Sequence, residues 1–383
     1  MPQLRVDEHI SSIAREDWNA LLAQSAQPTP FMRHEYLQAM IDSGSATAET
    51  GWAPLVLSLH DEDRLLGACM AWIKTHSYGE YVFDWAWADA YQRHGLEYYP
   101  KLLVAVPFTP VPGSRLLARD AASRALLAQG LQALAQQQQF SSVHLLFGDE
   151  ADQAAADSLG WLPRTGVQFH WQSNGHQDFT DYLASMQRDK RKKIQQEQRR
   201  VRDAGIEFEI REGAQIQEAD WDFFHHCYRL TYRAHHSTPY LSRDFFARMA
   251  AEMPSNWLMF IAKRGTNERV ACSLIALDPE QRAAFGRYWG CVENIPNLHF
   301  DACYYQPLAW CIANDYQRFE GGAQGEHKMA RGLMPVTTRS SHWLAHPDFR
   351  NAVGDFLERE GQAMEHYVDD LASHRPFKKA EQE

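Results

Sequence analysis

A glycine-rich segment near the C-terminal end carries several chemically versatile side chains. Residues 318–332 hold glycines at 321, 322 and 325 together with Glu320, Glu326, His327, Lys328 and Arg331. Glycines let a backbone approach a ligand closely and adopt positive φ angles. Carboxylates, an imidazole and cations together can supply a general base, a proton shuttle and charge stabilisation. We therefore take Glu320, Glu326, His327 and Lys328 as candidate catalytic residues, against the alternative of a glycine-rich turn with solvated charges.

A strongly basic segment covers residues 187–203. It holds eight basic and three acidic residues, a local charge of +5, and leaves 30 basic and 46 acidic residues elsewhere, a charge of −16. Ile194 and Val201 are seven residues apart, which predicts a helix with one apolar stripe. A bound phosphate would relieve the repulsion between neighbouring cations, so Lys190, Arg191 and Lys193 are candidate phosphate ligands. The alternative is a solvated helix docked on an acidic body.

Aromatic side chains mix with carboxylates and a histidine over residues 74–89, and Tyr98, Tyr99 and Lys101 follow. Such a mixture suits a cleft that holds a sugar, nucleotide or peptide by stacking and hydrogen bonds. It equally suits strand ends in a packed core. The candidate substrate-binding residues here are His76, Glu80, Asp84, Tyr98 and Lys101.

A metal site is not expected from the histidines and cysteines. His225-His226-Cys227 and His235-His236 lie about ten residues apart, and the tight ligand spacings that zinc prefers do not occur. The six cysteines are scattered singly, so we expect reduced thiols, with none marked as a nucleophile.

Length and charge bound the class of protein. A chain of 383 residues is long for one hydrophobic core, so two domains are expected. A net charge of −11 argues against coating nucleic acid or anionic membrane with the whole surface. The acidic N-terminus does not resemble a secretory signal and no stretch is apolar enough to span a bilayer, so we expect a cytoplasmic protein.

The apolar patterns predict alternating helices and strands. Helices are expected over 12–24, 35–42, from about 91, and over 121–139; strands are expected over 52–60, 64–73, 81–83, 143–147 and 167–171. This alternation predicts a mixed α/β protein.

The second half repeats short strings of the first at a displacement of 203 to 207 residues. Four pairs occur in the same order: Tyr36-Leu37 with Tyr240-Leu241, Ala68-Cys69 with Ala271-Cys272, Gly79-x-Tyr81 with Gly286-x-Tyr288, and Tyr98-Tyr99 with Tyr304-Tyr305. Ordered matches at about half the chain length predict a duplicated α/β unit. The polar segment 172–177 is the natural seam, which gives domains 1–175 and 176–383.

Several longer strings resemble one family, the FemAB-like predicted N-acyltransferases, also labelled peptidoglycan biosynthesis/recognition proteins. The strings span nearly the whole chain and lie at residues 31–37, 76–84, 98–102, 286–290, 303–306 and 320–328. The family is more distantly similar to the Fem transferases, which add amino acids from aminoacyl-tRNA to a peptidoglycan precursor. The resemblance implies two tandem GNAT-like (acyl-CoA N-acyltransferase) halves, each a mixed sheet flanked by helices.

The resemblance also implies site residues. His327-Lys328-Met329-Ala330-Arg331-Gly332 aligns with the Fem Phe-Lys-x-x-Phe-Gly stretch, whose lysine is implicated in catalysis, which gives Lys328 that role. The Fem proteins' second half opens with an Arg/Lys-rich segment that residues 190–194 resemble. Further substrate-binding candidates lie in the matching strings or beside the last of them: Arg33, His34, Arg287, Tyr288, Tyr304, Tyr305, Gln324 and Arg331.

The activity implied is transfer of an acyl or aminoacyl group to an amine acceptor, such as a cell-wall precursor or peptide. The donor is acyl-CoA or aminoacyl-tRNA. An amine deprotonated by Glu326 or His327 would attack the donor carbonyl, and Lys328 or a strand N–H would stabilise the oxyanion. The alternative is a non-catalytic module that recognises a peptidoglycan precursor or peptide in a cleft between the halves.

Overall fold

The computed structural model describes residues 2–266, 268–323 and 325–378. Contacts divide the chain into two compact units. The first comprises the residues up to Gly166 with Tyr240–Phe245 and Thr337–Tyr367, and the second comprises Val167–Pro239, Phe246–Val336 and the residues from Val368 on. Each unit is assembled from three separate segments of the chain, whereas the predicted domains 1–175 and 176–383 are continuous. The two continuous domains therefore stay a prediction.

The first unit is built on a mixed sheet. Among the described residues, its strands pair antiparallel except β4 with β6, which pair in parallel. The strands run in the order β1 (Gln3–Asp7), β2 (Trp52–Asp61), β3 (Arg64–Lys74), β4 (Lys101–Val104), β6 (Ser142–Leu145) and β13 (Met334–Leu344), and β5 (Leu117–Ala118) pairs with β3.

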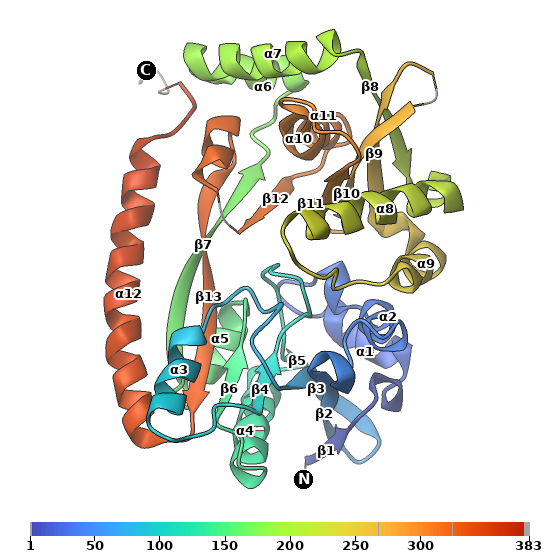
Figure 1. Ribbon diagram of the computed structural model, residues 1–383. Coiled ribbons are helices and arrows are strands. Elements are labelled where there is room, and N and C mark those ends of the chain that lie inside the picture. The colour runs from blue at the N-terminus through green and yellow to red at the C-terminus, as the bar shows by residue number, and fades with distance from the viewer. Residues whose placement is uncertain (1, 267, 324, 379–383) are drawn as a thin grey trace. The chain divides into compact units, whose positions relative to one another are not determined.

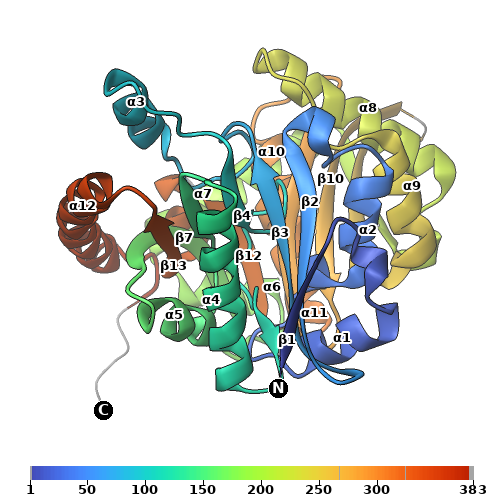
Figure 2. The same ribbon diagram turned by 90° about the horizontal axis from the view of Figure 1, so that it is seen from below.

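Helices cover the faces of this sheet because its central strands are apolar on both sides. Leu55, Leu57 and Leu59 of β2 alternate toward a core shared with Leu127 and Leu131 of α4 (Ala121–Gln137). Figure 2 shows α4 against the strands, beside α5 (Glu150–Asp157). The first unit also contains α1 (Arg15–Ala23), α2 (His34–Asp42) and α3 (Trp85–Arg93).

The second unit contains a sheet of the same kind (Figure 1). In the part of the chain that the structure describes, its strands pair antiparallel except β11 with β12, which pair in parallel. The strands run in the order β7 (Leu162–Gln172), β12 (Arg318–Ala323), β11 (Ala283–Cys291), β10 (Glu268–Asp278), β9 (Trp257–Arg264) and β8 (Ile206–Glu212).

The helices of the second unit include the predicted basic helix, α7 (Arg188–Asp203), which buries Ile194, Glu197 and Val201. The helix α8 (Glu218–Ala234) packs against β11. The two are so close that a Cβ at Gly290 of β11 would lie 2.1 Å from the Cys227 carbonyl oxygen of α8. The others are α6 (Phe179–Ser185), α10 (Leu298–Phe300) and α11 (Gln306–Ala313), while α9 (Arg243–Glu252) and α12 (Pro347–Ser373) each pass from the first unit into the second.

The two units repeat one strand order, with β2, β3, β4 and β6 matching β9, β10, β11 and β12. Ala68-Cys69 and Ala271-Cys272 occupy equivalent strands, β3 and β10. The other three string pairs do not: Tyr36-Leu37, for example, is helical and Tyr240-Leu241 lies in a loop. The two units therefore share a strand order, but three of the four matching string pairs do not lie at equivalent positions in it.

Two predicted elements were wrong. Residues 81–83 form no strand, because this segment is a loop that leads into α3, and that helix begins at Trp85 rather than near 91. The aromatic residues of the loop produced an apolar run without strand pairing.

Candidate active site

The parallel strands β11 and β12 part at one end. They pair from Ala283 with Arg318 to Phe285 with Glu320, and the next residues are Gly286 and Gly321. Each strand is irregular just there. The register of β10 and β11 shifts so that Leu274 faces Tyr288 and Ile275 faces Gly286, which makes Arg287 the additional residue of a bulge.

The glycines of β12 are required by its shape. The register of β12 and β7 shifts between Glu320 and Ala323, and Gly322 has a φ of 76°. At Gly321 a Cβ would lie 2.4 Å from a Leu333 methyl carbon and 3.0 Å from the Phe169 carbonyl oxygen. At Gly321 a side chain would clash with the protein's own chain, whereas Gly322 has open space and is favoured by its positive φ. The close approach of this backbone to a ligand stays a prediction.

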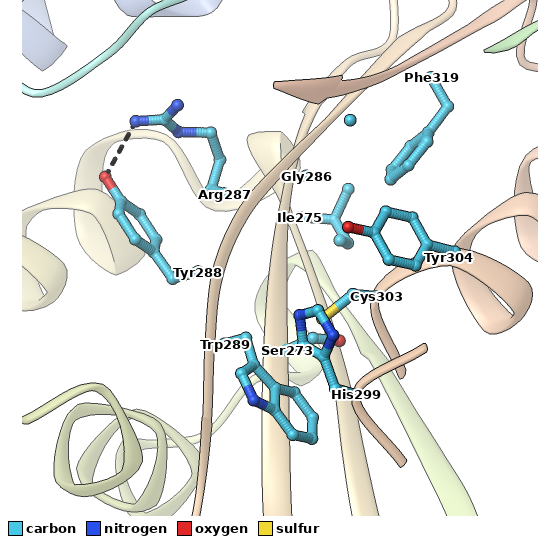
Figure 3. Close-up of a pocket in the computed structure, with 11 residues that line it drawn as sticks. Ser273, Ile275, Gly286, Arg287, Tyr288, Trp289, His299, Cys303, Tyr304 and Phe319 are labelled. Atoms are coloured by element: carbon cyan, nitrogen blue, oxygen red, sulfur yellow. Dashed lines mark hydrogen bonds between the residues drawn. The ribbon is translucent and has the colours of Figure 1, made fainter. Parts of the chain in front are cut away.

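A cavity of about 140 Å³ lies where the strands part (Figure 3). Strand residues supply Ser273, Ile275, Gly286 and Phe319, and the segment after β11 supplies His299, Cys303 and Tyr304. That segment contains a π-helical turn, Asp301–Tyr305, between α10 and α11. π-helical turns are rare in proteins, and those that occur often lie at functional sites. This one carries Cys303 and Tyr304 to the cavity.

Lys328 lies beside this cavity. It belongs to a 3₁₀ segment, Glu326–Arg331, and its Nζ donates a hydrogen bond to the Gly322 carbonyl oxygen at 3.3 Å. Its Cδ is 3.5 Å from the position of a Cβ at Gly321, and it interacts electrostatically with the Cys303 thiol. The side chain is 5% exposed, and burial lowers the pKa of Lys328 to about 8. A lysine in this state is a cation that gives up its proton near neutral pH.

His327 is the exposed neighbour of Lys328. Its Nε2 lies 3.5 Å from the Tyr304 hydroxyl, and its ring packs on Phe300. Burial, with the nearby Arg331 and Lys328, lowers the pKa of His327. A neutral, solvent-accessible imidazole beside a cavity wall residue is a suitable general base.

The other predicted catalytic residues differ from these two. Glu320 is buried, forms an ion pair with Arg318 at 3.0 Å and lies 3.7 Å from His170, so its charge is held within the sheet. The side chain of Glu326 and the whole of Gln324 lie outside the described residues.

Arg331 is buried and joins three parts of the second unit. Its guanidinium donates to the Glu197 carboxylate at 3.1 Å, to the His327 carbonyl oxygen at 2.7 Å, and lies 3.5 Å from the centre of the Phe300 ring. Tyr305 also donates its hydroxyl hydrogen to Glu197. Arg331, predicted to bind substrate, thus holds the 3₁₀ segment of Lys328 against α7. Tyr305, also predicted to bind substrate, holds the π-helical turn against the same helix.

The predicted phosphate ligands lie on α7. Lys190 and Arg191 are half-buried and Lys193 is exposed, and Lys190 forms an ion pair with Asp189 at 3.3 Å. Lys190 and Arg191 lie four and three residues before Ile194, beside the buried stripe of Ile194, Glu197 and Val201, which accounts for their partial burial.

Four predicted substrate-binding residues of the first unit form one buried ionic cluster. The Lys101 ammonium donates to Glu80 at 2.8 Å and to Asp84, and Asp84 accepts from the Tyr98 hydroxyl at 2.6 Å. Burial raises the pKa of Glu80 to about 7; it also raises the pKa of Asp84, but Lys101 outweighs it there and the net shift is downward. All four are nearly inaccessible to solvent.

The remaining candidates in the first unit make local contacts. Arg33 pairs with Glu35 at 2.8 Å, His34 lies 3.3 Å from the Ile10 carbonyl oxygen, and His76 lies 2.9 Å from that of Thr50. His34 is buried, and Arg33 and His76 are half-buried.

Sequence reasoning missed Glu197, His299 and Cys303. Glu197 had a usable signal, because it lies three residues after Ile194 and four before Val201, on the stripe that the helix buries. Cys303 also had one, because it begins the family-like string at residues 303–306. His299 had none, and the π-turn that orients Cys303 has no sequence pattern.

The described residues include no helix long and apolar enough to cross a membrane. Within the same residues, no group of three or more His, Cys, Asp or Glu side chains is placed to hold a metal ion.

The chain is similar to several solved structures and matches one protein family. FemX is similar at 9% identity and a TM-score of 0.54, covering 89% of this chain and 98% of FemX. L-PGS from Bacillus licheniformis is similar at 10% identity and a TM-score of 0.55, covering 90% and 97%. No curated protein sequence matches.

The expected fold class, α/β with two tandem GNAT-like halves, is confirmed. Residues 9–379 match the FemAB-like family, described as peptidoglycan biosynthesis/recognition, and the chain belongs to that family.

Proposed function

We propose that the chain is an N-acyltransferase that moves an acyl or aminoacyl group from a thioester or ester donor to an amine acceptor. The observation that carries the proposal is the cavity at the parting of β11 and β12, with Lys328 beside it and its pKa lowered to about 8. A group with this pKa can change protonation during turnover at neutral pH.

In the proposed reaction the amine nitrogen attacks the donor carbonyl carbon in the cavity. His327 takes the proton that the amine loses, and the Lys328 ammonium or a backbone N–H of β11 stabilises the oxyanion. The carbon–sulfur or carbon–oxygen bond of the donor then breaks, an amide remains, and the thiol or alcohol leaves with a proton. This direct transfer requires no acyl-enzyme.

Either acyl-CoA or aminoacyl-tRNA would bring phosphates to the site. Lys190, Arg191 and Lys193 on α7 would bind them, supported by the contacts that join α7 to the 3₁₀ segment of Lys328. The acceptor would be a cell-wall precursor or peptide, in keeping with the family.

Turnover of acyl-CoA and aminoacyl-tRNA panels with amine acceptors tests the proposal. Lys328→Ala and His327→Ala should each lower kcat by about 10² to 10³ while the fold persists by circular dichroism. Lys263→Ala, which removes a lysine of β9 that pairs with Glu209 and does not line this cavity, is the matched control and should retain full activity. Binding of a precursor by a parent protein that turns over no donor would instead support the recognition module.

A further inference from the structure

A second cavity of about 290 Å³ lies in the second unit, between α8 and β11. Half of its lining residues are tyrosine or tryptophan, and one is an arginine: Tyr228, Tyr232, Tyr288, Trp289 and Arg287. Arg287, Tyr288 and Trp289 also line the cavity where β11 and β12 part. Only side chains of β11 would therefore separate a ligand in the second cavity from the first cavity.

The bulge in β11 explains why a cation and a ring lie together here. Successive side chains of a regular strand point to opposite faces. Because the bulge adds Arg287 to the strand, the Arg287 and Tyr288 side chains lie on the same side (Figure 3), and an Arg287 nitrogen donates to the Tyr288 hydroxyl at 3.3 Å. The guanidinium also lies 5.1 Å from the centre of the Tyr288 ring.

The tyrosines are held by packing. Tyr228 meets Tyr288 edge to face at 5.4 Å and Tyr232 at 4.8 Å, and the Thr231 hydroxyl ties α8 to the Trp289 carbonyl oxygen at 2.8 Å. Preformed aromatic faces bind a ring at a small entropic cost.

The charge of the cavity selects the other part of the ligand. Among its described lining residues there is an arginine but no Asp or Glu. A guanidinium recognises carboxylate or phosphate through paired hydrogen bonds.

We propose that this cavity binds the acceptor, and that the acceptor is an amine that also carries a ring and an anionic group. The ring stacks on Tyr232 and Trp289, which are half-buried, the anion meets Arg287, and the amine reaches the first cavity. This inference rests on the proposed function for the role of the amine. The ring-bearing anion could be an amino sugar with an acidic substituent or an aromatic amino acid, which share the chemistry that the cavity recognises.

Equilibrium binding to the full chain, measured by calorimetry, tests the cavity without turnover. The two charged probes are D-glucosamine 6-phosphate and L-phenylalanine, and their counterparts without the anion are D-glucosamine and phenethylamine. We expect one charged probe to bind at least about tenfold more tightly than its counterpart. The probe that binds identifies the source. Equal affinity of charged and uncharged forms, or binding by neither charged probe, overturns the proposal.

Variants locate the binding. Arg287→Met should weaken the charged probe about tenfold and leave its counterpart unchanged, whereas Tyr232→Leu should weaken both. Arg229→Met, an exposed arginine of α8 outside the lining, is the matched control. An equal loss in Arg229→Met overturns the site.

The two proposals fail differently. Arg287-dependent binding with no transfer from any donor would overturn the proposed function and leave the site standing. Transfer to an acceptor that binds the parent protein and Arg287→Met with equal affinity would overturn the proposed site and leave the proposed function standing.

Discussion

The Arg331 guanidinium lies 3.1 Å from the Glu197 carboxylate, and both side chains are almost fully buried. Glu197 comes from α7, and Arg331 ends the 3₁₀ segment that carries His327 and Lys328. The same carboxylate accepts the Tyr305 hydroxyl from the π-turn that lines the first cavity. One buried acidic residue on a predominantly basic helix therefore fixes the two segments that border the cavity.

Removing this carboxylate should destabilise the fold. In Glu197→Ala the buried Arg331 cation loses its partner, and breaking a buried ion pair costs about 3 kcal/mol or more. Gln196→Ala, exposed on the same helix, should change the free energy of unfolding by less than about 0.5 kcal/mol. Urea unfolding measures both. Equal stabilities of the two variants would show that Glu197 holds nothing in place.

Lys328 should make stability depend on pH in one window. Its pKa of about 8 in the folded protein lies below the ordinary 10.5, so the unfolded chain binds more protons between these values. Lys328 therefore costs stability below pH 8, by about 3 kcal/mol, and this cost disappears as the pH approaches 10.5.

The difference between the parent and Lys328→Met isolates that effect from other titrating groups. The variant should be the more stable protein at pH 7, and its advantage should shrink toward pH 10. Lys192→Met serves as the exposed control, and its difference from the parent should stay flat. A flat difference for Lys328→Met as well would contradict the lowered pKa.

The sequence predicts the architecture better than the site, for a physical reason. Hydrophobic periodicity located β2, β3, α4 and α7 within a few residues, because burial of one stripe or of both strand faces leaves a regular pattern. The cavity depends on the bulge at Arg287 and on the π-turn that carries Cys303, and irregular backbone leaves no period to read. Gly321 could be predicted as a point of close approach, but its close neighbours in the protein itself, Leu333 and Phe169, could not.

Gly290 should not tolerate a side chain. A Cβ there would lie 2.1 Å from the backbone carbonyl oxygen of Cys227, so α8 would have to move away from β11. We expect Gly290→Ala to lower the free energy of unfolding by about 2 kcal/mol. Gly361→Ala in α12 has open space around it and should stabilise the protein by about 0.5 to 1 kcal/mol. Similar effects of both alanines in thermal unfolding would contradict this packing.

Lys101 should be required for the first unit to fold stably. Lys101→Met leaves the buried carboxylates of Glu80 and Asp84 without their shared cation, at a cost of about 3 kcal/mol or more. The triple change Lys101→Met, Glu80→Gln, Asp84→Asn removes all three charges and should recover most of that loss. Chemical unfolding compares them. A triple variant no more stable than Lys101→Met would show that the charges are not the source of the loss.

The position of the charges on α7, and not their number alone, should govern donor binding. At 16 residues the helix is about 24 Å long, so its two ends present separate groups of cations. Lys190→Gln, Arg191→Gln, Lys193→Gln should weaken binding of CoA or tRNA about tenfold and reduce its salt dependence. Arg199→Gln, Arg200→Gln, Arg202→Gln removes the same charge from the other end and should have a smaller effect. Equal losses in the two triple variants would mean that α7 attracts anions only through its net charge, because a specific phosphate site requires particular cations.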